Sequence, residues 1–185
     1  MSQPGSKDGS GSTLAGPAAG GAAPAAAPLG HSKNQLEMLE LVQRGMTMIP
    51  FNAYLGIDVT EVGVGLVRMR VPYRPELVGD PLKPALHGGV LAAVIDAAGG
   101  AAVWTMGTLQ DRISTIDMRV DYLIPARLET FYAEAKVVRR GRHVAVANIR
   151  TYHPDRPDET IAEGKAVYSI RTHTKELVDK IEQLR

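Results

Sequence analysis

The sequence predicts an α+β domain in which a mostly antiparallel sheet wraps one long, buried helix. Three observations lead to this prediction. An apolar run near the middle of the chain is too long for a strand. After it come only strand-like segments, until the chain closes with a short helical pattern. Finally, 44% of the 185 residues are hydrophobic, which suffices for one core but not for two large domains.

The N-terminal segment has a different composition from the rest of the chain. Its first 30 residues are almost wholly Ala, Gly, Pro and Ser, which predicts a disordered tail. We therefore expect a tail over residues 1–32 and a single folded domain over 33–185. The tail lacks the basic start and continuous apolar centre of a secretory signal, and the arginines of a mitochondrial transit peptide, so we expect a cytoplasmic protein.

Charge and composition exclude several function classes. The chain has 21 Lys and Arg against 20 Asp and Glu, and this balance gives no general attraction to nucleic acid or to an anionic membrane. It has no cysteine, which excludes disulfides, zinc-thiolate sites and cysteine nucleophiles. The five histidines lack metal-ligand spacing, and no phosphate loop, serine elbow or dinucleotide fingerprint occurs. We therefore expect no metal and no cofactor.

The first elements are a helix and a pair of strands. Ser32 can cap a helix over residues 33–46, which Pro50 would end. Residues 54–73 have a strand-like pattern broken by Gly63 and Gly65, as in two strands joined by a glycine turn. The apolar face expected for the helix comprises Leu36, Leu39, Val42 and Met46.

The long apolar run follows a loop rich in Pro and Gly over residues 74–85. We expect a buried helix from about Gly88 to Met106, interrupted only by Asp96. A carboxylate at the middle of a membrane span is costly, so this helix is not expected to cross a bilayer.

Four strands and a short helix complete the predicted domain. The expected strands cover residues 114–125, 128–138, 143–152 and 160–171, and the helix covers 174–185. In the first strand, Ile116, Met118, Val120 and Tyr122 alternate with charged residues, so these four side chains are predicted to face the core.

Asp96 requires an explanation, because a carboxylate in an apolar helix loses several kcal/mol of hydration unless a partner compensates. All its neighbours on the same helical face except Val103 are small, and they include Gly99 and Gly100. These two glycines indicate that another backbone or a substrate approaches closely. The alternative is that the small face only packs against a neighbouring element, with Asp96 satisfied by a hydroxyl or an arginine.

The start of the buried helix carries a second signal. The tripeptide His87-Gly88-Gly89 places free backbone N–H groups and the positive end of the helix at one point. Its glycines let a ligand oxygen come close, so the tripeptide has the features of an oxyanion site.

Gly88 and Asp96 cannot act on the same carbonyl from one helix. They are eight residues apart, or roughly 12 Å at ~1.5 Å per residue, whereas reacting groups must lie about 3 Å from the reacting atoms. If two copies pack these helices antiparallel about a two-fold axis, Gly88 of one can face Asp96 of the other. We therefore predict an obligate dimer with active sites at its interface.

Three segments, LHGGVLAAVID, STIDMRVDYLIPA and VVRRGRHVAVANIR, resemble the hotdog-fold acyl-CoA thioesterases of the phenylacetate-pathway and thioesterase superfamily member 2 type. The resemblance covers roughly residues 49–171. It implies a helix wrapped by a curved antiparallel sheet, a homodimer with a continuous sheet, and often a homotetramer.

The same resemblance implies roles for individual residues. Asp96 corresponds to the catalytic carboxylate, acting as general base or as nucleophile. Gly88 corresponds to the backbone N–H that polarises the carbonyl, His87 to the histidine beside it, and Thr115 to a hydroxyl that orients water. The alternative is that Thr115 has no catalytic role and occurs there because threonine is favoured in β-strands.

The residues expected to bind substrate are Gly89, Asp80, Arg139, Arg140 and Arg142. Asp80 stands where relatives often carry Asn, and it could equally be a solvated loop acid. The three arginines offer donors for the phosphates of coenzyme A, with a solvated hairpin tip as the alternative.

The sequence thus favours hydrolysis of an acyl-CoA thioester to free acid and CoA. The alternative is a hotdog protein that binds or senses acyl-CoA without cleaving it. The related dehydratases are disfavoured, because their His-Phe-Pro-Gly type loop and helix Glu do not occur. The sequence does not indicate which acyl group the substrate carries.

Overall fold

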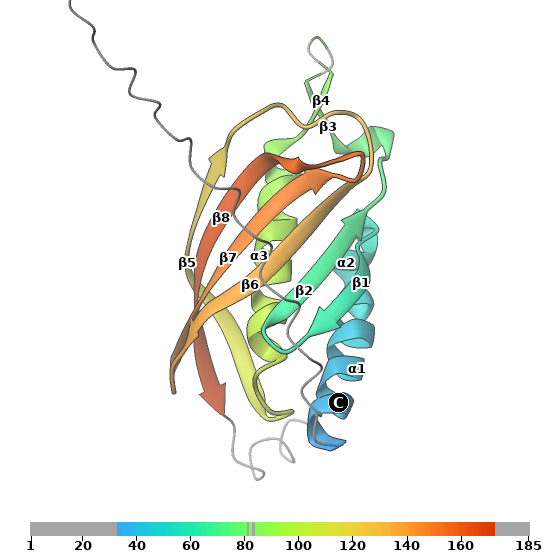
Figure 1. Ribbon diagram of the computed structural model, residues 1–185. Coiled ribbons are helices and arrows are strands. Elements are labelled where there is room, and N and C mark those ends of the chain that lie inside the picture. The colour runs from blue at the N-terminus through green and yellow to red at the C-terminus, as the bar shows by residue number, and fades with distance from the viewer. Residues whose placement is uncertain (1–32, 81, 83, 173–185) are drawn as a thin grey trace, which may run out of the picture. The chain divides into compact units, whose positions relative to one another are not determined.

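A six-stranded antiparallel sheet wraps around the helix α3 in the computed structural model, which describes residues 33–80, 82 and 84–172 (Figure 1). The helices are α1 (Lys33–Met48), α2 (Pro50–Leu55) and α3 (Gly88–Trp104), with a 3-10 turn at Pro75–Leu77. The strands are β1 (Asp58–Gly63), β2 (Leu66–Val71), β3 (Val78–Asp80), β4 (Ala85–Leu86), β5 (Asp111–Tyr122), β6 (Phe131–Arg140), β7 (Val144–His153) and β8 (Arg156–Thr172).

The large sheet has the order β1-β2-β6-β7-β8-β5, and every neighbouring pair is antiparallel. The predicted α+β class is confirmed, with two strands before the buried helix and four after it. The loop expected over residues 74–85 contains the 3-10 turn and a small hairpin of β3 and β4.

Small side chains let α3 lie close to the sheet. The inner faces of β6, β7 and β8 carry fully buried alanines, namely Ala133, Ala135, Ala145, Ala147 and Ala166. Gly164 on β8 is one point of close approach, since a Cβ atom there would lie 2.3 Å from Cγ2 of Ile95 on α3. Any other residue at this position would push the helix away from the sheet.

One prediction about the N-terminal helices is confirmed and one is wrong. The first helix ends at Met48, before Pro50 as expected, and Pro50 also begins the short helix α2, where its missing N–H and fixed φ are compatible with the first turn. The buried face of α1 comprises Met38, Val42 and Met46. Leu36 is exposed, because the helix turns the row of residues four apart toward the core.

The prediction for β5 needs two corrections, because Ile116 and Tyr122 are both exposed instead of facing the core. The register shifts between Thr115 and Asp117, so Ile116 lies in a bulge and its side chain is 58% exposed. Met118 and Val120 pack against the core as expected. A strict alternation in the sequence cannot reveal an extra residue of this kind.

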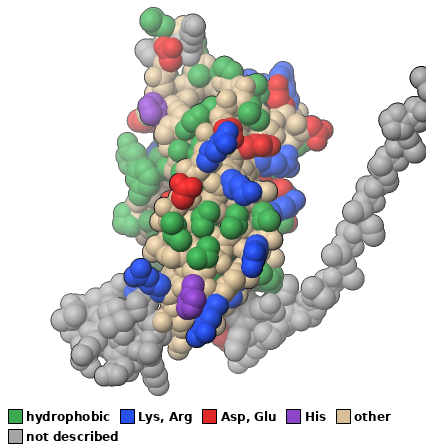
Figure 2. Space-filling view, turned by 90° about the vertical axis from the view of Figure 1, so that its left-hand side faces the viewer, with side chains coloured by type: hydrophobic (Ala, Val, Ile, Leu, Met, Phe, Trp, Pro, Cys, Tyr) green, Lys and Arg blue, Asp and Glu red, His purple; other side chains and the backbone are tan. Residues whose placement is uncertain are grey.

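Strand β5 is an edge of the sheet. Its neighbour on one side is β8, and the described residues provide no strand on the other side. Ile116, Tyr122 and Leu123 are all exposed there. Figure 2 views this side of the molecule and shows apolar side chains among lysines and arginines.

The tail expected over residues 1–32 and the helix expected over 174–185 lie outside the described residues. In the part of the chain that is described, no helix has the length and apolarity needed to cross a bilayer.

Candidate active site

A cavity of about 760 Å³ lies between α3, the junction of α1 and α2, and the first half of β5. It contains two carboxylates, Asp96 and Asp111. The carboxylate of Asp111 is paired with Arg140 (3.2 Å), whereas no cation in the described part of the chain pairs with Asp96. The α3 residues along its wall are Ala93, Asp96, Ala97, Gly100, Ala101 and Trp104.

Asp96 is half-buried and receives one hydrogen bond at its carboxylate. The Thr115 hydroxyl on β5 donates to Oδ1 at 2.7 Å. Within the described residues nothing donates to Oδ2, which leaves this oxygen available to accept a proton from a water molecule. The arrangement can therefore orient a carboxylate for general-base chemistry.

Tyr168 explains the two glycines in the middle of α3. Its hydroxyl donates to the Asp96 backbone carbonyl at 3.0 Å, and a Cβ on Gly99 would lie 2.2 Å from that hydroxyl oxygen. The group that approaches Gly99 is thus a side chain of β8. At this glycine the alternative interpretation holds, in which the small face of α3 packs against a neighbouring element. Sequence reasoning missed Tyr168, because it looks like any other inward-facing strand residue.

The Tyr168 hydroxyl remains a neutral donor. Burial raises the pKa of this phenol well above its ordinary value, and the nearby charge of Asp96 raises it further, against a lowering by a hydrogen bond to the Gly100 backbone. The hydroxyl therefore keeps its proton near neutral pH, where it donates to the Asp96 backbone carbonyl.

At the start of α3, His87 caps the helix with its side chain. His87 Nδ1 accepts a hydrogen bond from the Gly89 N–H at 2.9 Å. The Gly89 N–H, which was expected to contact substrate, therefore already donates to a side chain of the same protein. The Gly88 N–H has no acceptor in the described part of the chain, and the Tyr122 hydroxyl donates to the Gly88 carbonyl at 3.0 Å.

One chain keeps these two groups of residues apart. The cavity is lined by Asp96 and Thr115 but not by His87 or Gly88. Eight residues of helix separate Gly88 from Asp96, about 12 Å at the usual rise. Each chain thus carries two halves of the predicted site at different places.

The remaining residues expected to bind substrate lie away from Asp96. Asp80 is exposed and its Oδ1 accepts the Leu82 N–H at 2.8 Å within the β3–β4 hairpin. Arg140 is held by its ion pair with Asp111. Arg139 and Arg142 are exposed around the β6–β7 turn, so both guanidinium groups are accessible to a ligand.

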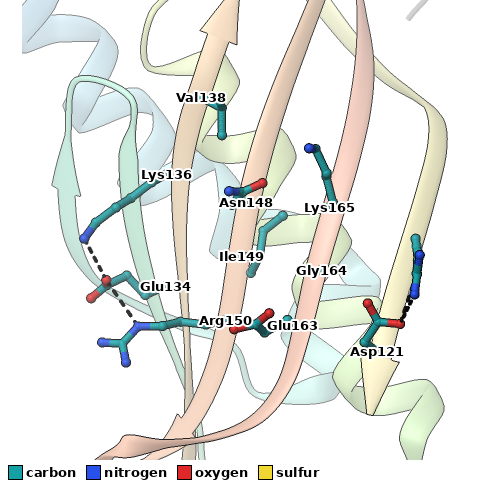
Figure 3. A pocket seen from close by; sticks show the side chains of 11 residues that line it. Asp121, Glu134, Lys136, Val138, Asn148, Ile149, Arg150, Glu163, Gly164 and Lys165 are labelled. Atoms are coloured by element: carbon teal, nitrogen blue, oxygen red, sulfur yellow. Dashed lines mark hydrogen bonds and ion pairs between the residues drawn. The ribbon is translucent and has the colours of Figure 1, made fainter. Parts of the chain in front are cut away.

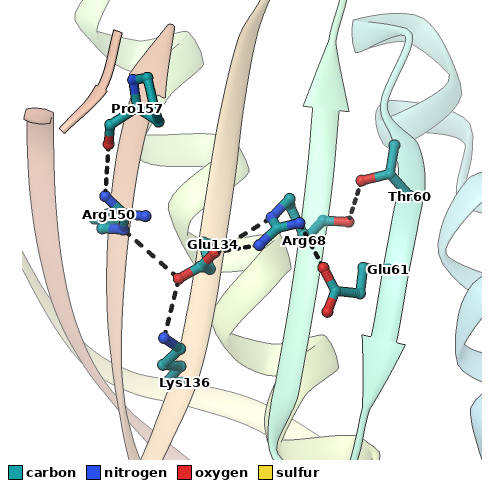
Figure 4. Close-up of polar contacts among 7 residues, drawn as sticks. All are labelled: Thr60, Glu61, Arg68, Glu134, Lys136, Arg150 and Pro157. Atoms are coloured by element: carbon teal, nitrogen blue, oxygen red, sulfur yellow. Dashed lines mark hydrogen bonds and ion pairs between the residues drawn. The ribbon is translucent and has the colours of Figure 1, made fainter. Parts of the chain in front are cut away.

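A second hollow, of about 530 Å³, lies on the outer face of the sheet (Figure 3). Its main feature is the buried Glu134, which is 6% exposed and pairs with Arg68 (2.7 Å), Lys136 (3.2 Å) and Arg150 (3.6 Å). Figure 4 shows that these contacts join β2, β6 and β7. Glu134 is thus engaged in holding strands together.

The ion pairs of Glu134 also control its titration. Burial alone would raise its pKa, but hydrogen bonds from Arg68 and Lys136 outweigh burial and hold the pKa below its ordinary value. The residues described by the structure include no group of three His, Asp or Glu side chains that could hold a metal ion.

Comparisons with known proteins agree with this geometry. The family model of the thioesterase superfamily matches residues 84–160. A putative esterase from Halobacterium salinarum is 35% identical over 125 residues, which cover 64% of this chain and 82% of the relative. The medium/long-chain acyl-CoA thioesterase YigI from Escherichia coli is 33% identical over 135 residues, 66% of this chain and 86% of the relative.

Solved structures show the same similarity. A Shewanella oneidensis protein related to the thioesterase superfamily has 31% identity and a TM-score of 0.69, covering 76% of this chain and 100% of its own. A thioesterase family protein from Silicibacter pomeroyi has 27% identity and a TM-score of 0.67, covering 72% of this chain and 98% of its own.

Proposed function

Because the chain belongs to the thioesterase superfamily, with its hotdog fold, we propose that it hydrolyses acyl-CoA thioesters to free acid and CoA at Asp96. Relatives named as esterases and as acyl-CoA thioesterases make it a thioester hydrolase. The name of the Escherichia coli relative supports a medium- or long-chain acyl group as substrate.

The observation that carries this proposal is the pairing of Asp96 with Thr115 in a cavity of about 760 Å³. Asp96 Oδ2 removes a proton from a water molecule, and the water oxygen attacks the thioester carbonyl. Thr115 holds the other carboxylate oxygen, so that Asp96 keeps one orientation. The tetrahedral intermediate then collapses, the C–S bond breaks, and CoA leaves as a thiolate that takes up a proton.

The developing oxyanion needs a donor that the cavity of one chain lacks. We assign this role to the Gly88 N–H of a second copy, which is free of internal acceptors in the described residues and lies at a positive helix end. His87 positions it by capping the same turn. The unit that acts is therefore a homodimer, and a homotetramer would repeat the same site.

The edge strand β5 supports such a dimer. No other strand of the described residues covers this edge, which is 12 residues long, and Ile116, Tyr122 and the adjoining Leu123 are exposed, so the edge can pair with another strand. An antiparallel β5–β5 contact would cover this edge and join two sheets. It would also place the Thr115 side of each site at the interface.

The wider substrate contacts follow from charge. Arg139 and Arg142 are exposed and can meet the phosphates of CoA, and Asp80 on the β3–β4 hairpin can contact the pantetheine arm. We assign the catalytic unit to residues 33–185, with residues 1–32 as a tail, and place the activity in the cytoplasm, where acyl-CoA is found.

The test is thiol release from a panel of short, long and aromatic acyl-CoAs, with Asp96→Asn compared at matched dimer content. We expect turnover by the wild type and a loss of at least ~10² in the variant, the scale of general-base catalysis. Saturable acyl-CoA binding without thiol release from any substrate would contradict hydrolysis and favour a binding or sensing protein.

A further inference from the structure

The cavity beside Asp96 is a groove that follows α3 toward its C-terminal end. Asp96 and Trp104 both line it and are eight residues apart, about 12 Å along the helix. Strand β5 forms the facing wall. Thr115 of β5 lies beside Asp96, and Asp111, where β5 begins, lies beside the segment after α3, since its carboxylate accepts the Thr108 N–H at 3.0 Å.

The walls between these two ends suit an unsubstituted hydrocarbon chain. On α3 the lining residues beyond Asp96 are small, namely Ala97, Gly100 and Ala101. Ile113 of β5 and Met46 of α1 also line the groove. The other charged lining residues, Asp111 and Arg112, are the first two residues of β5, and the uncharged polar lining residues besides Thr115 and Tyr168 are Asn52, Gln110 and Ser114.

Two apolar side chains at the α1–α2 junction line the groove and remain uncovered. Ile49 is 43% exposed and Phe51 is 57% exposed. Burial of apolar surface is favourable at about 25 cal/mol per Å². A hydrocarbon chain lying in the groove would cover both residues, so their exposure is consistent with a surface that a ligand completes.

Trp104 is the last α3 residue that lines the groove. It is the last residue of α3 and the single tryptophan of the chain. Its six-membered ring faces α1, where a Cβ on Gly45 would lie 3.7 Å from Cζ3. The indole thus lies between α3 and α1 at the C-terminal end of the α3 wall.

We propose that Trp104 sets the length of the acyl chain that this site accepts, with the thioester carbonyl at Asp96 and the methyl end against the indole. The inference rests on the proposed function for the identity of the substrate. The substrate class is then the unbranched, saturated acyl-CoAs whose chains reach from Asp96 to Trp104. Longer chains meet the indole, and shorter chains leave part of the groove filled with water.

The kinetic test uses saturated acyl-CoAs from butanoyl to hexadecanoyl with three variants. Trp104→Ala removes the indole, so the acyl chain with the highest kcat/KM is expected to be longer. For two added methylenes, at about 0.8 kcal/mol each, we expect kcat/KM to rise ~10-fold. Trp104→Phe, which keeps most of the packing on Gly45, is expected to shift the optimum less. Ala97→Leu obstructs the groove midway and is expected to shift it to shorter chains.

The control is Val138→Ala, a change at a 59% exposed residue of the outer hollow that should leave the chain-length profile unchanged. A common factor of loss for all chain lengths in both Trp104 variants would overturn the proposal. It would show that the groove holds the pantetheine arm, which every substrate shares.

A binding measurement separates this proposal from the proposed hydrolysis. Because Trp104 is the single tryptophan, its fluorescence reports directly on the far end of the groove. With S-alkyl-CoA thioethers, which cannot be hydrolysed, we expect a change only once the chain is long enough to reach the indole. The same change with CoA alone would overturn the proposal. A length-dependent change without thiol release from any acyl-CoA would support it and contradict hydrolysis.

Discussion

The Thr115 hydroxyl donates a hydrogen bond of 2.7 Å to Asp96 Oδ1, and this bond connects the edge strand β5 to the middle of α3. Tyr168 holds the backbone of the same aspartate from β8. The carboxylate is therefore fixed from two strands, one through its side chain and one through its main chain. Such support keeps a general base in place without the cost of reorientation during the reaction.

Replacing Thr115 by valine removes the hydroxyl and keeps the shape of the side chain. We expect kcat to fall by roughly 10-fold with little change in KM, because Asp96 loses an orienting donor but remains a base. Thr115→Ser retains the hydroxyl and should recover most of the rate. Steady-state kinetics of both variants measures these effects, and thermal unfolding checks that each variant is folded. Equal losses of activity in Thr115→Ser and Thr115→Val would contradict this role.

The contact between Gly99 and Tyr168 should limit what α3 tolerates. A Cβ on Gly99 would lie 2.2 Å from the Tyr168 oxygen, so Gly99→Ala is expected to lower the free energy of unfolding by about 1–3 kcal/mol, as overpacking does. Tyr168→Phe removes that oxygen, and the double variant should recover part of the loss. Chemical denaturation of the four proteins measures this coupling, and strictly additive effects would contradict the contact.

Glu134 should make the stability of the sheet depend on pH. Its folded pKa lies below the ordinary value of 4.5, so its stabilisation is present above pH 4.5 and is lost as the pH falls through the folded pKa. Glu134→Gln should therefore unfold more easily by about 1–3 kcal/mol near neutral pH, with a difference that shrinks in acid.

The matched control for this prediction is Glu61→Gln. Glu61 also pairs with Arg68, but from an exposed position, so its loss should change stability by less than about 1 kcal/mol. Urea denaturation at several pH values compares the two variants. A Glu134→Gln deficit that stays constant from neutral pH into acid would show that ionisation is not its cause.

The sequence predicted the parts of the fold and site that break a pattern. Asp96 stands out because it is charged within an apolar helix, and Gly88 because it follows a histidine at a helix start. The order of elements was predictable from hydrophobic period and length. These signals lie within short stretches of the sequence, so they can be recognised without knowing which distant residues come into contact.

Features that depend on contacts between elements distant in the sequence were not predictable. Tyr168 reaches Gly99 only because β8 and α3 meet at those residues. The bulge that exposes Ile116 adds a residue without any change in composition. Arg140 looked like a phosphate ligand because nothing in the sequence indicates that Asp111 lies beside it.

The Gly88 N–H can be deleted with little damage to α3. Gly88 is the first residue of the helix, a position where proline fits. The preceding His87 has φ −65° and ψ 129°, an extended conformation suitable before proline. Gly88→Pro should lower kcat by about 10²–10³, the usual effect of losing one oxyanion donor.

Gly88→Ala is the control for that change. It keeps the N–H and places a Cβ at the same point, 3.1 Å from Cε1 of Tyr122. It should therefore share any steric effect of proline but keep most of the rate. Thiol release at saturating substrate compares them, and equal losses in both variants would assign the effect to Tyr122 rather than to the N–H.

Mixing two inactive variants tests whether the site is shared between subunits. A dimer of Asp96→Asn with Gly88→Pro has one site carrying both lesions and one site carrying neither, if Asp96 of one subunit faces Gly88 of the other. Random assortment of equal amounts makes half the dimers mixed, so about a quarter of the wild-type activity should return. Mixing Asp96→Asn with the double variant should restore nothing, because no intact Asp96 remains. If mixed dimers form, as native mass spectrometry would report, and activity still does not return, Gly88 and Asp96 do not combine across the interface and the shared site is wrong.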